Sequence, residues 1–83
     1  MTLFLISYDL IRPEKDYPDL IRTLRNIGAR RVLRSGWMIR SSVDSSDVFD
    51  RVWIGGNLDR KDKLLVVEVN GSTASENINM KGL

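Results

Sequence analysis

An apolar run near the start of the chain, from Leu3 to Tyr8, constrains the fold more than any other feature. Successive side chains of a strand point to opposite faces, and here both alternating sets are apolar. Such a strand is typical of the centre of a sheet that is covered on both faces. A chain of 83 residues builds only one thin core, so we expect one of the two covers to come from another chain.

Two later segments have apolar residues at helical spacing. The first begins after Asp16, a candidate N-cap, and ends at Gly28, which favours a C-terminal stop. The second begins after residues 44–46, which offer three N-cap side chains, and ends at Gly55-Gly56. Three short segments are predicted to be strands: residues 30–33, 37–42 and 63–69.

The predicted order is therefore strand, helix, strand, strand, helix, strand. With right-handed crossovers this order gives a ferredoxin-like α+β fold, in which a four-stranded antiparallel sheet carries both helices on one face. We expect this domain to span residues 1–70, and residues 71–83 to form a flexible tail or a segment that docks on a partner. Because the helix-free face of the first strand needs a cover, we expect a homodimer.

The chain contains neither cysteine nor histidine. Thiolate nucleophiles, cysteine-based metal sites and imidazole general bases are therefore excluded. Phosphodiester hydrolysis would then need a divalent cation such as Mg²⁺ or Mn²⁺ on carboxylate oxygens. The apolar run is too short to cross a bilayer and has no basic leader, so we expect a cytoplasmic protein without membrane contact.

Positive charge is concentrated in the middle of the sequence. The net charge is only +2, but residues 20–43 contain six arginines and no acidic residue. These arginines are Arg22, Arg25, Arg30, Arg31, Arg34 and Arg40. Arginine suits phosphate recognition, so this segment favours contact with RNA or DNA. The alternative is that the arginines are solvated or pair with acids of the flanking segments.

Asp9 is the strongest candidate for chemistry, because a carboxylate directly after an apolar strand is costly unless it is hydrated, paired or bound to a cation. It could instead cap the loop that follows. One aspartate is a poor magnesium site, whereas two copies across a two-fold axis would form a better one. Ser35 lies in a turn, where its amide and hydroxyl can meet a phosphate. Tyr8 and Trp37 either stack on bases or pack in the core.

Several short motifs together resemble the second core protein of CRISPR adaptation, a family of small endonucleases related to virulence-associated protein D. They are Ser7-Tyr8-Asp9, the helix that ends at Gly28, Arg31-Val32-Leu33-Arg34-Ser35-Gly36-Trp37, and the strand over 63–69. The resemblance implies a ferredoxin-like homodimer that is either a metal-dependent nuclease on RNA or DNA or a scaffold that holds DNA for an integrase-type partner. It also implies that Asp9 faces its dimer mate and binds the metal.

The leading hypothesis is a dimeric, Mg²⁺-dependent endonuclease in which Asp9 holds the metal and Ser35 assists. Tyr8 and Trp37 are expected at the dimer interface. The residues expected to position the nucleic-acid backbone are Arg12, Arg31, Arg34 and Arg40. The alternatives are a non-catalytic nucleic-acid scaffold or toxin–antitoxin-type module, and a protein-interaction module that binds no nucleic acid. Glu14 is interpreted as part of a solvated loop, and residues 57–62 as a polar loop.

Overall fold

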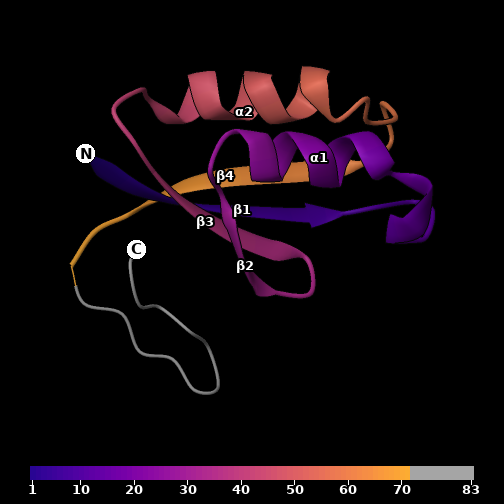
Figure 1. Cartoon of the computed structure of the whole chain (residues 1–83), viewed down its shortest axis with the longest axis horizontal. Coiled ribbons are helices and arrows are strands. Elements are labelled where there is room, and N and C mark those ends of the chain that lie inside the picture. The colour runs from indigo at the N-terminus through magenta and orange to yellow at the C-terminus, as the bar shows by residue number, and fades with distance from the viewer. Residues whose placement is uncertain (72–83) are drawn as a thin grey trace.

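The computed structural model describes residues 1–71, and they form the predicted α+β fold (Figure 1). The strands are β1 (Thr2–Asp9), β2 (Arg30–Leu33), β3 (Gly36–Ser41) and β4 (Lys63–Val69). The helices are α1 (Pro18–Asn26) and α2 (Ser45–Gly55), and a short 3₁₀ helix, η1 (Glu14–Asp16), precedes α1. Of the predicted tail, residues 72–83 lie outside the described residues.

The four strands form one antiparallel sheet in the order β2-β3-β1-β4, so β1 is a central strand as predicted. Both helices lie on the same side of this sheet (Figure 1). Phe4, Ile6 and Tyr8 of β1 point to that side and are buried. The two helices contribute their own buried stripes to the same core, namely Leu20, Leu24, Val48 and Val52.

The opposite side of the sheet, here called the open face, is covered by no helix among residues 1–71. It carries the alternate side chains of β1, including Leu5, together with their cross-strand partners Met38 and Val67. Leu65 and Val67 are 58% and 41% exposed. No helix in the described part of the chain is long and apolar enough to cross a membrane.

The start of α1 differs from the prediction, because Asp16 is not its N-cap. Asp16 closes η1, and Tyr17 occupies the N-cap position without a side-chain hydrogen bond. Pro18 instead defines the start, since proline fits the first helical position, where its missing amide hydrogen is not needed.

The other helix ends follow the predicted residues. Gly28 has a φ of 91°, and the amides of Gly28 and Ala29 donate to the carbonyls of Arg25 and Leu24. This pattern is the Schellman motif, which favours glycine at its left-handed position. At the start of α2, the carboxylate of Asp44 accepts a hydrogen bond of 2.9 Å from the Asp47 amide.

A buried carboxylate, Asp62, joins the loop after α2 to the segment between β1 and α1. Only 5% of Asp62 is exposed, and it accepts hydrogen bonds from the Ile11 amide, the Tyr17 hydroxyl and the Asp59 amide at 2.8–2.9 Å. Burial alone would raise the pKa of Asp62, but these three donors outweigh it and hold the pKa below its ordinary value. The interpretation of residues 57–62 as a polar loop missed these contacts, which join residues 45 positions or more apart.

We expect Asp62→Ala to lower the free energy of unfolding by about 2–4 kcal/mol, because it leaves buried donors without an acceptor. Asp50→Ala, on the exposed surface of α2, is the matched control and should change stability by less than about 0.5 kcal/mol. Urea denaturation of both variants checks this expectation. Equal stability of the two would contradict the role given to Asp62.

Candidate functional site

A shallow hollow of about 220 Å³ lies at the end of the sheet where β1 stops. It brings together four of the residues for which the sequence predicts catalysis or nucleic-acid contact, namely Asp9, Arg12, Arg34 and Ser35. All four are exposed. The other lining residues are Tyr8, Leu10 and Glu14.

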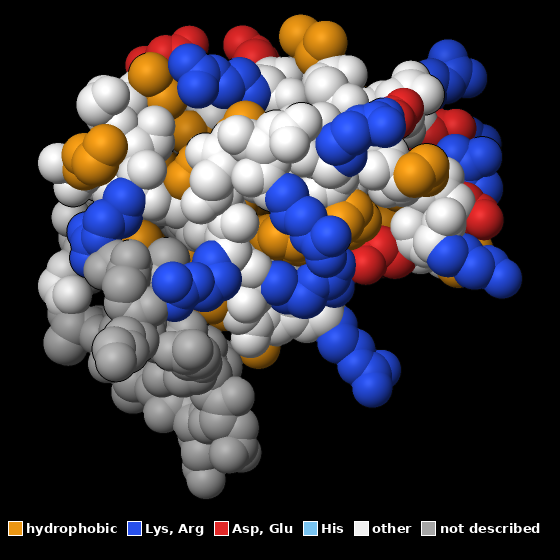
Figure 2. Space-filling view, in the orientation of Figure 1, with side chains coloured by type: hydrophobic (Ala, Val, Ile, Leu, Met, Phe, Trp, Pro, Cys, Tyr) orange, Lys and Arg blue, Asp and Glu red, His pale blue; other side chains and the backbone are white. Residues whose placement is uncertain are grey.

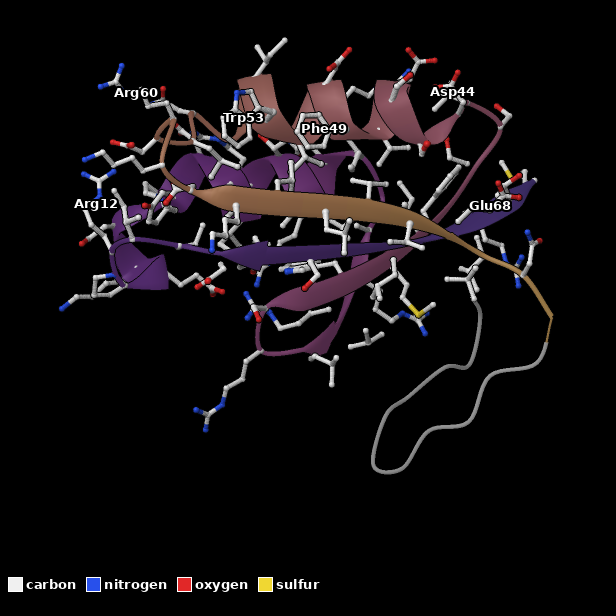
Figure 3. All side chains as sticks on the ribbon, turned by 180° about the vertical axis from the view of Figure 1, so that it is seen from behind. Arg12, Asp44, Phe49, Trp53, Arg60 and Glu68 are labelled. Carbon is white, nitrogen blue, oxygen red and sulfur yellow. The ribbon has the colours of Figure 1, made fainter. Side chains whose placement is uncertain are left out.

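Strand pairing explains why these residues meet. Ser7 lies opposite Gly36 in the β1–β3 register, and the Tyr8 amide donates to the Ser35 carbonyl at 3.2 Å. The turn between β2 and β3 is therefore held beside the last residues of β1. Arg12 follows β1 directly, and its guanidinium lies 5.0 Å from the centre of the Tyr17 ring. Figure 3 shows Arg12 at this end of the sheet, near Arg60 and far from Glu68.

Asp9 is the last residue of β1, and the register places it opposite Lys63 of β4 on the open face. It also lines a second hollow of about 170 Å³, beside Ser7, Lys63 and Leu65. Within residues 1–71, no three acidic side chains are grouped so that they could hold a metal ion. Asp9 is therefore the single carboxylate that one protomer offers on this face of the strand end, and a hard cation would need more oxygen ligands from elsewhere.

Tyr8 and Trp37 lie on the helix side of the sheet, with 6% and 2% of their surface exposed. Trp37 Nε1 donates to the Tyr8 hydroxyl at 2.9 Å, and that hydroxyl donates to Glu14 Oε2 at 2.8 Å. Of the two interpretations of these aromatic residues, the structure therefore has core packing. Neither ring lies on the open face, and the place of Tyr8 and Trp37 at a dimer interface stays a prediction.

Arg31 lies outside the hollow and is committed to other partners. Its guanidinium donates to both carboxylate oxygens of Glu14, at 2.7 and 3.2 Å, and lies 4.7 Å from the centre of the Trp37 ring. These bonds hold the pKa of Glu14 below its ordinary value. The sequence analysis did not predict that Glu14 pairs with Arg31. The structural feature that accompanies this pair is the β2–β3 register, which sets Arg31 opposite Trp37.

Arg40 does not join the hollow either. The β1–β3 register sets it opposite Leu3, six residues along the strand from Asp9. At about 3.3 Å per residue, the separation is roughly 20 Å. A nucleic-acid backbone that contacts both Arg40 and the hollow would therefore have to run along the open face.

The distribution of charge over the surface agrees with the arginine-rich middle of the sequence. Figure 2 shows lysine and arginine side chains spread over the face on which β2 lies toward the viewer. Acidic side chains gather mainly toward the upper and right-hand margins of that view. Arg22 pairs with Asp19 and Arg31 with Glu14, so part of this positive charge is neutralised locally.

The chain matches no model of a known protein family, and it matches no curated protein. The resemblance to the CRISPR adaptation family therefore stays a prediction that rests on the short motifs quoted above.

Burial raises the pKa of Tyr8 to about 12 from an ordinary value of 10. A group whose pKa is raised in the folded state contributes stability below its unfolded pKa and loses it as the pH rises through the folded value. We therefore expect the free energy of unfolding to fall by about 2–3 kcal/mol between pH 10 and 12 on account of Tyr8.

Urea denaturation at several alkaline pH values, on the wild type and on Tyr8→Phe, measures this contribution. The variant loses hydrogen bonds and should be less stable at neutral pH, but its stability should fall less steeply above pH 10. Parallel alkaline curves for the two proteins would contradict the assignment.

Proposed function

We propose that this protein binds the phosphate backbone of RNA or DNA at the hollow beside the end of β1. The observation that carries the proposal is that Arg12, Arg34 and Ser35, all exposed, line one concave site. Guanidinium groups and a turn hydroxyl are typical phosphate ligands, and such contacts give binding without sequence specificity. Because nucleic acid is the proposed ligand, the proposed compartment is the cytoplasm.

We further propose that two copies of the chain form a metal-dependent endonuclease. Asp9 supplies one carboxylate per protomer, so the Asp9 side chains of two protomers would hold Mg²⁺ or Mn²⁺ together. The cation would supply the positive charge that phosphodiester hydrolysis needs in a site without histidine. Arg12 and Arg34 would orient the phosphate, and Ser35 would donate a hydrogen bond to one of its oxygens.

The open face supports a homodimer, because its exposed apolar side chains lie on a central sheet that has helices on one side only. An integrase-type protein partner is the alternative occupant of this face. A second candidate function, a non-catalytic nucleic-acid scaffold or a toxin–antitoxin-type module, is favoured by the lack of a three-carboxylate cluster within residues 1–71.

Arg12→Gln and Arg34→Gln should each weaken binding of labelled single-stranded RNA or double-stranded DNA. Each lost phosphate contact should also reduce the slope of log K against log salt concentration by about 1. Fluorescence anisotropy across salt concentrations checks both effects. Arg51→Gln, which removes an exposed charge on α2, is the matched control. Equal slopes for the wild type and both hollow variants would remove the proposed site.

Cleavage is tested by incubating the same oligonucleotides with Mg²⁺, with Mn²⁺ and with EDTA. We expect products only with the metal ions, and their loss in Asp9→Ala and Asp9→Asn, with affinity for the oligonucleotide largely kept. Tight binding without cleavage would leave the scaffold function. Cleavage that survives in both Asp9 variants would contradict the role of this carboxylate.

Leu65→Glu should shift the protein from dimer to monomer at micromolar concentration, because it puts a charge at an exposed apolar position of the proposed interface. Ile54→Glu is the matched control, since Ile54 is 77% exposed on α2, away from the open face. Sedimentation velocity distinguishes the two states. A wild-type particle of 9.5 kDa would rule out the homodimer.

A further inference from the structure

We propose that Arg31 is a positioning residue that fixes the two walls of the hollow and does not itself bind phosphate. This inference rests on the proposed function and adds to it, because it separates the arginines that contact the ligand from one that orders the site. The arginine-rich segment predicts a phosphate contact for Arg31, so the inference also reverses what its position in the sequence indicates.

The first observation is that Arg31 joins two segments that both line the hollow. One is the segment after β1, which carries Arg12 and Glu14; Arg31 NH2 donates to Glu14 Oε1 at 2.7 Å and NH1 to Oε2 at 3.2 Å. The other is the turn after β2, where Arg31 NH1 donates to the Arg34 carbonyl at 2.6 Å. A single guanidinium therefore sets the distance between Arg12 and the Arg34–Ser35 turn.

The second observation is that this bridge is anchored in the core. Glu14 Oε2 also accepts from the Tyr8 hydroxyl, which in turn accepts from Trp37 Nε1. The Trp37 ring lies under the Arg31 guanidinium at 4.7 Å, so it limits the planes that the fork can adopt. Tyr8 and Trp37 are both buried, and they transmit a fixed position to Glu14 and Arg31.

The third observation is that most of the donors of Arg31 already have partners. Three of its five N–H groups donate to two carboxylate oxygens and one carbonyl, and one face of the guanidinium lies on an aromatic ring. A bidentate pair of this kind has a defined geometry, which suits it to hold segments in place. Arg31 is also absent from the lining of the hollow, whereas Arg12 and Arg34 both line it.

Glu14→Gln distinguishes the two roles by the sign of its effect. If Arg31 were a phosphate ligand, Glu14 would compete with the phosphate, so Glu14→Gln would free the guanidinium and tighten binding. If Arg31 positions the walls through Glu14, the same variant loosens the bridge and weakens binding. Removing the negative charge of Glu14 would by itself tighten the binding of a phosphate nearby. Weaker binding by Glu14→Gln would therefore have to come from loss of the bridge.

The experiment measures anisotropy of labelled single-stranded RNA and double-stranded DNA with the full chain over a range of salt concentrations. We expect Arg31→Gln and Glu14→Gln each to weaken binding about 3- to 10-fold, with the salt slope of the wild type. The double variant should bind no more weakly than the worse single variant, because both changes break one bridge. Arg31→Lys keeps the charge but not the fork, so it should also weaken binding. Circular dichroism of each variant confirms that it is folded.

Tighter binding by Glu14→Gln, or a salt slope reduced by about 1 in Arg31→Gln, would overturn the positioning role. That failure is distinguishable from failure of the proposed function. In the first case the wild type still binds, and Arg12→Gln and Arg34→Gln still reduce the slope. If the wild type does not bind, or if neither variant matters, the hollow is not a phosphate site and the inference falls with it.

Discussion

The hydroxyl group of Tyr8 sits inside the core, where a polar group must have hydrogen-bond partners or cost stability. This hydroxyl accepts a hydrogen bond from the Trp37 indole and donates one to the Glu14 carboxylate. Glu14 is itself charged and half-buried, so it requires a cation, and Arg31 fills that requirement with a bidentate pair. One buried hydroxyl thus links β1 and β3 to η1 and β2, and the hollow lies beside this linked corner.

Because the helices cover only one side of the sheet, the two faces of β1 have different surroundings. Residues of β1 that face the helices pack in the core, and residues that face the other way lie on the open face. Tyr8 and Asp9 are adjacent in the sequence but belong to different faces, because side chains alternate along a strand. At the end of β1, the buried Tyr8 is therefore followed directly by the exposed carboxylate of Asp9.

Local patterns predicted most of the fold because they act over a few residues. The strands at 30–33 and 63–69, the stop at Gly28 and the cap at Asp44 all follow from neighbouring residue types. The register between β1 and β3 brings Asp9 and Ser35 to the same hollow, and no local pattern predicts that register. The roles of Asp62 and Glu14 depend on partners 17–51 positions away, which no local pattern shows. The pairing of Arg31 with Glu14 agrees with the alternative that these arginines pair with acids of the flanking segments, but no local pattern shows which acid is the partner.

Binding and cleavage make different demands on the number of protomers. The hollow is complete within one chain, because all of its lining residues come from β1, the segment after β1 and the β2–β3 turn. A metal site is not, because one protomer brings a single exposed aspartate to the end of β1 and sets Lys63 opposite it. The positive charge of Lys63, opposite Asp9 in the register, disfavours a cation beside a single Asp9. Only the approach of a second carboxylate reverses that balance, which makes the proposed cleavage, unlike the proposed binding, a property of the dimer.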